Sequence, residues 1–272
     1  MNYQDRERIA LNMRANILKM TNQAASGHPG GSLSAVELMI TLFFNEMNIN
    51  EDNLNDVQRD KFVLSKGHAS PVLYSVLAAK GFFPESELMK FRNLGADLQG
   101  HPNMRSVRGV DMSTGSLGQG LSVAVGMSLA NKLDNNDFRT YVLCGDGECE
   151  EGQIWEASMA AAHYKLDNLC AILDFNGLQI DGNVTDVMNP TPFDKKFEAF
   201  GWNVIDLENP YDYTQIEEAF AKARLCKGKP SIIIAHTVKG KGISFMENKS
   251  AWHGVAPNNE QLKAALEELG VQ

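Results

Sequence analysis

The stretch at residues 145–182 reads Gly145-Asp146-Gly147-Glu148-Cys149-Glu150-Glu151-Gly152, then Asn176-Gly177, and ends in Ile180-Asp181-Gly182. Short apolar runs at 140–144 and 169–173 precede the two polar segments and predict two strands. Residues 152–164 between them are rich in Ala, Glu and Met, which predicts a helix. The stretch therefore predicts a β-α-β unit, whose parallel strands end side by side.

Two side chains with oxygen ligands, Asp146 and Asn176, follow these two strands and stand 30 positions apart. Such oxygens bind Mg²⁺ or Ca²⁺, and Mg²⁺ with few protein ligands usually completes its shell with phosphate and water. Gly147 allows the backbone to approach phosphates, and the helix that follows offers N–H groups to an anion. Gly-Asp-Gly alone is also ordinary turn chemistry. The flanking strands and the spacing favour a site for a metal ion and a diphosphate.

These residues resemble the thiamine diphosphate motif, and residues 147–157 are similar to the transketolase version of it. The resemblance extends from Ser26-Gly27-His28-Pro29-Gly30 to Trp252-His253-Gly254. It covers nearly the whole chain, but only the first of the three domains of a full-length transketolase. It implies thiamine diphosphate as cofactor and Mg²⁺ or Ca²⁺ as metal.

The resemblance also implies roles for single residues. Asp146 and Asn176 match metal ligands, and Leu178 matches the residue that adds a backbone carbonyl. Glu151 matches a buried residue that links the cofactor sites of the two halves of the enzyme, whereas Glu150 could equally be a solvated carboxylate at a helix N-terminus. The remaining matches lie beside the cofactor, in a glycine loop that opens a helix and around the metal ligand: Gly115, Ser116, Leu117, Gly118, Gly145 and Gly147.

Four of the six histidines adjoin glycine, at His28, His68, His101 and His253. Imidazoles on such loops can donate to phosphate oxygens and move protons at neutral pH. The resemblance places His28 near substrate oxygens, His68 and His101 near the cofactor and the terminal hydroxyl of the donor, and His253 at the diphosphate and the reacting oxygen. The loop before His253 differs in length from the expected pattern. The other two histidines, His163 and His236, are interpreted as structural.

Strands that alternate with helices predict an α/β fold with a doubly wound, mostly parallel sheet flanked by helices. The sequence shows no repeat or linker and predicts one domain over 1–272, which the resemblance implies is a thiamine diphosphate-binding domain. The segment 237–258 reads as a long functional loop. Ser70 is expected to cap a helix that begins with Pro71. Strands are expected at 62–64, 140–144, 169–173, 203–205 and 231–235. Other helices are expected at 3–21, 34–45, 85–94, 119–133, 152–164, 213–225 and 259–269.

Composition limits the classes of function. A net charge of −9 without a Lys/Arg run argues against a nucleic-acid surface. The longest apolar stretch, 33–44, is too short to span a bilayer, and the charged residues 5–8 exclude a secretory signal. The four cysteines show no CxxC pairing and read as reduced residues of a cytoplasmic protein.

The pyrimidine-binding and C-terminal domains of a transketolase have no counterpart here and are expected on a partner chain. The resemblance thus implies the N-terminal subunit of a split transketolase, active only with its partner as an α2β2 heterotetramer. The assembly would transfer a two-carbon ketol unit from a ketose to an aldose, usually as sugar phosphates of the pentose phosphate pathway. Sulfonated or branched sugars fit this half equally well. The alternatives are a 2-oxo-acid dehydrogenase component, a split deoxyxylulose-phosphate synthase-like subunit, or a non-catalytic assembly subunit. Residues 150–157 and 26–30 favour transketolase over the first two.

Overall fold

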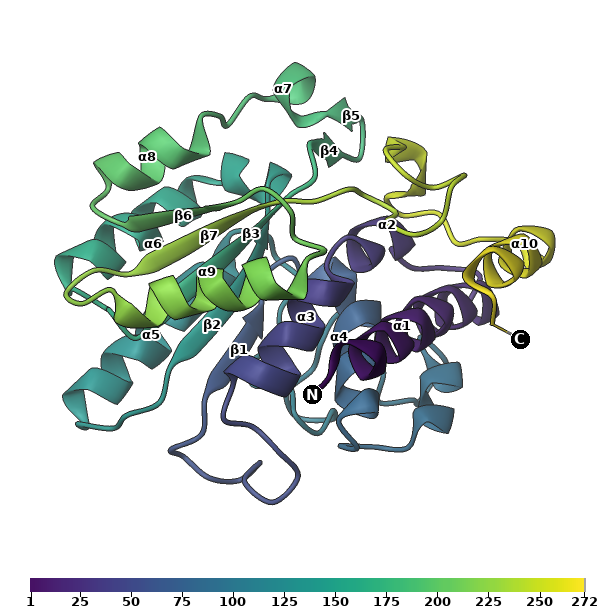
Figure 1. Cartoon of the computed structure of the whole chain (residues 1–272), viewed down its shortest axis with the longest axis horizontal. Helices are drawn as coiled ribbons and strands as arrows, with labels where there is room; N and C mark the ends of the chain where they lie inside the picture. The colour runs from purple at the N-terminus through teal and green to yellow at the C-terminus, as the bar shows by residue number, and fades with distance from the viewer. Residues whose placement is uncertain (272) are drawn as a thin grey trace.

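The computed structural model describes residues 1–271, which build a five-stranded parallel sheet in the order β1-β2-β3-β7-β6 (Figure 1). The strands match the predicted apolar runs and extend them by a few residues. Their bounds are β1 Lys61–Leu64, β2 Thr140–Gly145, β3 Leu169–Phe175, β6 Asn203–Leu207 and β7 Ser231–His236.

Helices cover both faces of this sheet, because successive strand residues point to opposite sides. Tyr141 and Leu143 of β2 enter one core, whereas Val142 and Cys144 enter the other. The first core includes helices α1 Tyr3–Gln23, α3 Val36–Thr41, α4 Ser70–Ala79 and α9 Tyr213–Leu225. The second includes α5 Gln119–Leu133, α6 Gly152–His163 and α8 Phe193–Ala199. The predicted doubly wound α/β class is confirmed.

The remaining elements are short, apart from α10 Asn259–Leu269, which packs on α1. They include the helices α2 Pro29–Leu33 and α7 Val184–Val187 and an antiparallel hairpin of β4 Leu178–Gln179 and β5 Gly182–Asn183. One π-helical turn spans Leu42–Glu46, and 3-10 turns span Gly67–Ala69, Glu85–Lys90, Gly147–Glu150 and Ser250–Trp252. The sequence patterns did not predict α2, α7, α8 or the hairpin.

Two helix predictions need correction. The helix expected at 85–94 is a 3-10 helix that ends at Lys90, because Phe91 turns into the core and Arg92 takes a left-handed backbone with φ of 59°. Ser70 lies within α4 instead of capping it, and its hydroxyl donates to the Gly100 carbonyl at 2.9 Å.

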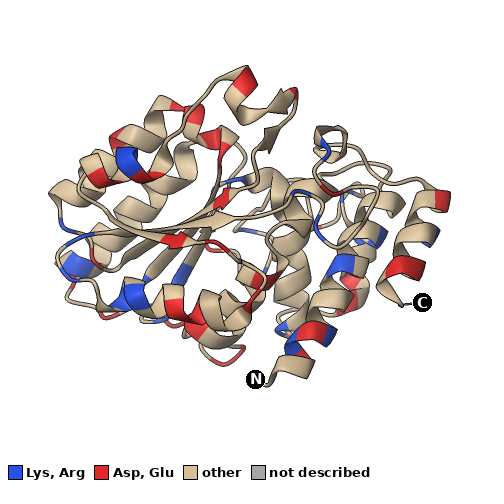
Figure 2. Cartoon of the chain, turned by 45° about the horizontal axis from the view of Figure 1, so that its top comes forward, with Lys and Arg blue, Asp and Glu red and all other residues tan. Residues whose placement is uncertain are grey.

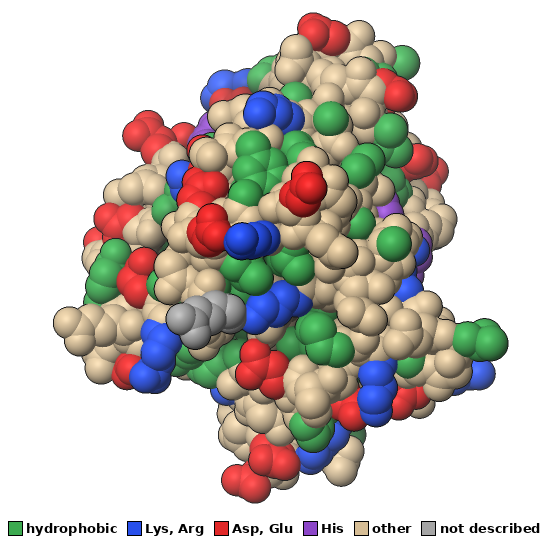
Figure 3. Space-filling view, turned by 90° about the vertical axis from the view of Figure 1, so that its right-hand side faces the viewer, with side chains coloured by type: hydrophobic (Ala, Val, Ile, Leu, Met, Phe, Trp, Pro, Cys, Tyr) green, Lys and Arg blue, Asp and Glu red, His purple; other side chains and the backbone are tan. Residues whose placement is uncertain are grey.

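Acidic and basic residues are interspersed along the helices (Figure 2). The face over α10 likewise mixes charged and apolar groups (Figure 3). Within residues 1–271, no helix is long and apolar enough to cross a membrane. All four cysteines are unpaired thiols; Cys144, Cys149 and Cys170 are buried and Cys226 is half-buried, in agreement with the sequence interpretation.

The loops that carry most of the site residues selected from the sequence follow the carboxyl ends of β1, β2, β3 and β7. The β4–β5 hairpin follows β3, and the segment 237–258 follows β7; the two lie on the same side of the sheet (Figure 1). The Lys239 ammonium of the second segment donates to the Leu178 carbonyl of the hairpin at 2.6 Å. The sheet therefore gathers segments that are far apart in the sequence around one edge.

Candidate active site

A cavity of about 330 Å³ opens at the carboxyl ends of the strands. Most of the residues selected from the sequence line it. These are His28, His68, Gly115, Leu117, Gly145, Asp146, Gly147, Glu151, Asn176, Leu178 and His253. Three selected residues, His101, Ser116 and Gly118, do not line this cavity.

Asp146 follows β2 and is only 3% exposed. One of its carboxylate oxygens accepts from the Gly147 N–H at 2.8 Å, and the other accepts from the Gly177 N–H at 2.6 Å. Burial, with the Asp174 carboxylate nearby, raises the pKa of Asp146 to about 6. A buried carboxylate with a raised pKa gains from a cation placed beside it.

Asn176 and Leu178 complete a set of hard oxygen donors of the kind that Mg²⁺ and Ca²⁺ prefer. The Asn176 amide donates to Asp174 at 2.9 Å, which orients its oxygen away from that carboxylate. The Leu178 carbonyl accepts from Lys239, so the structure already places a cation at this oxygen. Within residues 1–271, no three His, Cys, Asp or Glu side chains are grouped to hold a metal. A metal site here would therefore depend on the amide and carbonyl oxygens beside Asp146, and these residues fit one.

Asp174 and Lys66 line the cavity and form a buried ion pair that the sequence analysis missed. The Lys66 ammonium donates to Asp174 at 2.5 Å and to the Gly31 carbonyl at 2.6 Å. Asp174, which is fully buried, also accepts from the hydroxyls of Ser34 and Thr237. Burial raises the pKa of Asp174, but Lys66 and these donors outweigh it and hold the pKa below its usual value. The pair and its donors join β3 to the segments that follow β1 and β7 at the wall of the cavity.

Glu148 is a second buried carboxylate that was missed. It is 3% exposed and accepts from the Gly118 N–H and the Gly145 N–H, both at 2.9 Å, and from the Ser65 hydroxyl. Gly118 has a φ of +81°, and a Cβ there would lie 2.8 Å from the Glu151 Cβ. Gly118 therefore serves the site through its backbone, although its atoms lie outside the cavity. Glu148 ties the ends of β1 and β2 to the glycine loop.

His28, His68 and His253 come from three separate loops and form a triangle. Their ring centroids are 5.1 Å apart for His28–His68, 5.5 Å for His28–His253 and 5.1 Å for His68–His253. Burial, with neighbouring positive charge, lowers the pKa of His28 to about 4 and of His253 to about 3, and holds that of His68 well below its usual value. The imidazoles are therefore neutral at pH 7, and each can donate one hydrogen bond and accept another.

His101 lies outside this triangle, beyond the glycine loop. Its ring would be 3.3 Å from a Cβ at Gly115, so it packs against the outer side of a residue that lines the cavity. It is exposed, as is Ser116. Burial, followed by the charge of Arg92, lowers the pKa of His101. The structure brings His101 beside the site rather than into it.

Glu151 is exposed in this chain, whereas the sequence interpretation expected a buried residue. It precedes α6 and lines the mouth of the cavity. Glu151 is exposed because no described residue of this chain covers it. Its neighbour Glu150 is held by a hydrogen bond from Gln179 at 2.6 Å.

Lys239 and Gln179 also line the cavity and were missed. Lys239 is 2% exposed, and its ammonium lies 3.0 Å from His253 Nδ1. Burial, opposed by Asp146 and Asp174, lowers the pKa of Lys239 to about 8. A single Lys in a loop is weak evidence for a functional residue in a sequence. Its position shortly after the end of β7 could nevertheless have suggested that Lys239 lies near the site.

The donor set fits a diphosphate as well as a metal ion. Lys239 supplies positive charge, and the His28 Nδ1 atom is buried without a hydrogen-bond partner, as a group reserved for a ligand or water would be. A Cβ at Gly31 would lie 3.7 Å from His68 and 3.9 Å from Lys66, so glycine leaves this wall of the cavity open. The cavity thus offers cations, neutral imidazoles and oxygen ligands together.

Comparison with known proteins shows the family to which the chain belongs. The profile of the family described as "Transketolase, thiamine diphosphate binding domain" matches residues 5–272. The 6-deoxy-6-sulfo-D-fructose transketolase subunit SqwG of Clostridium sp. (strain MSTE9) is 43% identical over 268 residues, which are 97% of each chain. An apulose-4-phosphate transketolase subunit of Phocaeicola vulgatus is 42% identical over 94% of this chain and 90% of that protein.

Longer relatives match over only part of their length. Transketolase of Homo sapiens is 41% identical over 94% of this chain and 41% of its own length. The crystal structure of transketolase from Campylobacter jejuni superposes with a TM-score of 0.93 at 35% identity, and this chain covers 44% of it. The chain therefore spans nearly all of the subunit relatives and about two-fifths of the longer transketolases.

Proposed function

Because this chain belongs to the transketolase family and carries its thiamine diphosphate-binding domain, we propose that it is the diphosphate-binding subunit of a split transketolase. The assembled enzyme transfers a two-carbon ketol unit from a ketose to an aldose. The observation that carries the proposal is the match, along nearly the full length of both chains, to proteins named as transketolase subunits. The deoxyxylulose-phosphate synthase and 2-oxo-acid dehydrogenase alternatives are not favoured by these matches.

In this proposal the chain holds the charged end of the cofactor. Asp146, Asn176 and the Leu178 carbonyl would hold Mg²⁺ or Ca²⁺, and Lys239 would offset the charge of the diphosphate. Thiamine diphosphate, when bound, supplies the nucleophilic carbon that accepts the ketol unit. The support for these roles is the donor set of the cavity and the two backbone N–H groups that fix the Asp146 carboxylate.

The histidines act on hydroxyl groups of the sugar. His28, His68 and His253, being neutral, can each accept a proton from a hydroxyl or donate to an oxygen at the nitrogen that faces it. His101 adds a polar group beyond Gly115, on the outer side of the cavity wall. His28, His68 and His253 line the cavity itself, whereas His101 lies beside it.

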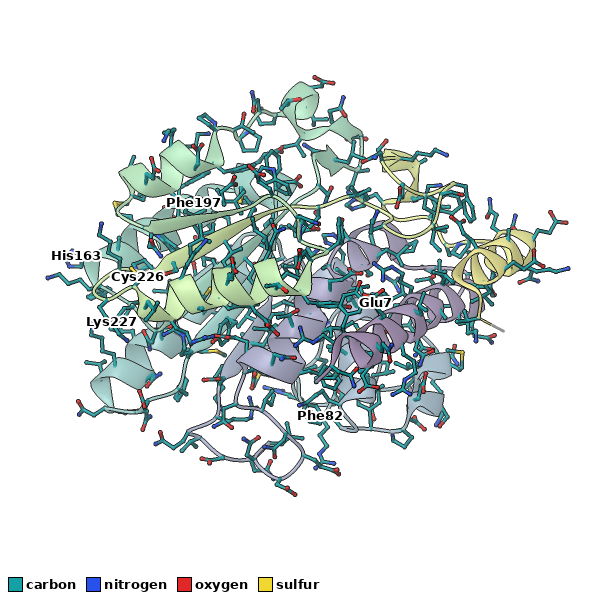
Figure 4. The ribbon with its side chains drawn as sticks, viewed as in Figure 1. Glu7, Phe82, His163, Phe197, Cys226 and Lys227 are labelled. Carbon is teal, nitrogen blue, oxygen red and sulfur yellow. The ribbon has the colours of Figure 1, made fainter. Side chains whose placement is uncertain are left out.

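Replacing His68 or His101 with Ala is expected to lower the turnover of the reconstituted enzyme by more than roughly tenfold, as is usual for lost acid–base or hydrogen-bonding groups. His163→Ala is the matched control, since His163 is the last residue of α6 (Figure 4) and does not line the cavity. Steady-state kinetics at saturating cofactor would measure the effect. Normal turnover in both site variants would contradict the assignment.

The proposed partner is a separate chain that carries the pyrimidine-binding domain, in an α2β2 assembly. Exposed apolar side chains lie at the hairpin beside the cavity and on the helices α5, α6 and α7, where a partner could cover them. Ile180, Val187 and Met188 are exposed around the hairpin and α7, and Leu133 and Met159 are exposed on α5 and α6. Glu151, at the open mouth of the cavity, would be covered in this assembly.

The purified chain is expected to show no ketol transfer alone and to become active when mixed with its C-terminal partner. The reason is that it offers groups for the diphosphate and metal, whereas activation of the aminopyrimidine is expected from the pyrimidine-binding domain of the proposed partner. Gel filtration and a ketol-transfer assay, with and without the partner, would test this. Full activity of this chain alone would refute the split-enzyme proposal.

The proposal does not specify which class of sugar the enzyme uses. Relatives are named for sulfofructose and for apulose 4-phosphate, and the solved relatives include one with sedoheptulose 7-phosphate. We place the protein in the cytoplasm, a reducing compartment in which its unpaired thiols would stay reduced. We also propose a role in carbohydrate metabolism, such as the pentose phosphate pathway. Product analysis with a ketose phosphate and with pyruvate as donors would separate transketolase from its alternatives.

A further inference from the structure

Arg92 lies between the segment that leads into His28 and the segment that leads into His101. Its guanidinium donates to the Ser26 hydroxyl at 3.2 Å, two residues before His28. The same guanidinium fills the space beside Gly100, where a Cβ would lie 2.6 Å from it. Gly100 immediately precedes His101. One side chain therefore contacts both histidine segments, which are otherwise more than 70 residues apart in the chain.

The backbone at Arg92 is shaped for this position. Arg92 has a φ of 59°, in the left-handed region that non-glycine residues adopt at a cost. Its N–H donates to the Leu98 carbonyl at 2.8 Å, and Phe91 is buried against Gly27, where a Cβ would lie 3.1 Å from the Phe91 ring. Such a strained residue persists where the surrounding contacts determine it, and it commonly marks a functional site.

Helix α4 also holds the His101 segment. The Ser70 hydroxyl donates to the Gly100 carbonyl at 2.9 Å, and the Tyr74 hydroxyl donates to the Gln99 carbonyl at 2.8 Å. The segment is thus held both by α4 and by the Arg92 guanidinium. Losing Arg92 would remove one of these two supports and leave the other intact.

We propose that Arg92 is a positioning residue that sets the His28 and His101 segments relative to each other, and so determines how the sugar hydroxyls are held. The substrate part of this inference rests on the proposed transketolase function. The geometric part does not rest on that function, because Arg92 contacts Ser26 and Gly100 within this single chain, without a partner.

The charge of Arg92 supports the same role. After burial, Arg92 is the largest cause that lowers the pKa of His28, ahead of His101 and Lys239, and it is the second cause at His101. His28 also faces His68 and His253 in the triangle. A fixed cation disfavours the protonated imidazole, so removing it raises the pKa of both histidines.

The first test uses this chain alone. Histidine resonances would be titrated by NMR in the unaltered chain, Arg92→Met, Arg92→Lys and the control Arg105→Met, an exposed arginine beyond His101. The expected result is an upward shift of the His28 and His101 titrations in Arg92→Met, with Arg92→Lys close to the unaltered chain. Arg105→Met should shift His28 less. Unchanged titrations in Arg92→Met would overturn the electrostatic part.

The second test uses the enzyme reconstituted with its partner and fructose 6-phosphate as donor. Arg92→Met and Arg92→Lys should both raise the KM for the sugar by roughly tenfold or more, because neither side chain fills the space of the guanidinium fork between Ser26 and Gly100. The affinity for thiamine diphosphate should stay within about threefold. Parallel loss of cofactor affinity would show a general structural role and refute the positioning role, as would an unchanged KM.

The two tests separate failure of this inference from failure of the proposed function. If the unaltered assembly transfers no ketol unit from fructose 6-phosphate, 6-deoxy-6-sulfo-D-fructose or sedoheptulose 7-phosphate, the proposed function is wrong, and the titration still decides whether Arg92 acts on the two histidines.

Discussion

Asp146→Ala is expected to weaken metal-dependent binding of thiamine diphosphate by roughly 100-fold or more, equivalent to about 2.7 kcal/mol. Asp146 is the charged member of the proposed oxygen ligand set, and a carboxylate contributes charge as well as geometry to a divalent ion. Its two oxygens also accept from the Gly147 and Gly177 N–H groups, so the variant loses the contact that joins the β2 and β3 ends. Asn176→Ala, which removes a neutral ligand, should cost less.

Calorimetric titration with Mg²⁺ and thiamine diphosphate would measure the loss, and circular dichroism would show that the fold survives. Asp181→Ala is a suitable control, because Asp181 is an exposed carboxylate in the turn of the neighbouring β4–β5 hairpin. It should bind the cofactor normally. Unchanged affinity in Asp146→Ala would rule out the assigned metal site.

Lys66→Met is expected to destabilise the fold by about 3–5 kcal/mol, the usual result of leaving one member of a buried ion pair without its partner. The side chains of Lys66 and Asp174 are 2% and 0% exposed, and the remaining donors to Asp174 are neutral. The variant would place an uncompensated carboxylate at the wall of the cavity. Urea unfolding at pH 7 would measure the change in free energy of unfolding.

The dependence on pH identifies the cause. In the unaltered chain the pKa of Asp174 lies below 3.8. The ionised Asp174 therefore stabilises the fold above about pH 4, and this stabilisation is lost as the pH falls through the folded-state pKa. Without Lys66, burial dominates and the pKa of Asp174 rises. Protonation of Asp174 at mildly acidic pH then removes the uncompensated buried charge and restores part of the stability of the variant. The stability deficit should therefore shrink from pH 7 to pH 5. Adding Asp174→Asn should recover part of it at pH 7, whereas a purely additive double variant would argue against the ion pair as the cause.

The strands and most helices could be predicted because they depend on local patterns. The apolar runs at 140–144 and 231–235 became β2 and β7, and the helix expected at 119–133 is α5. The Gly-Asp-Gly and Asn-Gly segments follow neighbouring parallel strands, so the position of Asp146 beside the Asn176–Gly177 segment also followed from the topology.

The residues that support the site could not be predicted, because their roles arise from contacts between distant segments. Lys66 and Asp174 are 108 positions apart, and Glu148 meets Ser65 across 83 positions. Within its own segment, Glu148 resembles any acidic residue of a turn. Arg92 likewise ends a stretch that resembles a helix, and its left-handed backbone follows from the burial of Phe91.

Glu148 also constrains how the site can move. Its carboxylate lies sealed among the ends of β1 and β2 and the glycine loop, and withdrawing any one of them would leave a buried charge short of a hydrogen bond. These three segments are therefore expected to open only together, in a rare and cooperative fluctuation. The β4–β5 hairpin contacts its neighbours through separate hydrogen bonds, from Gln179 to Glu150 and from Lys239 to the Leu178 carbonyl. These bonds can break one at a time, so we expect the hairpin to move when the cofactor enters or leaves, while the three segments around Glu148 stay together.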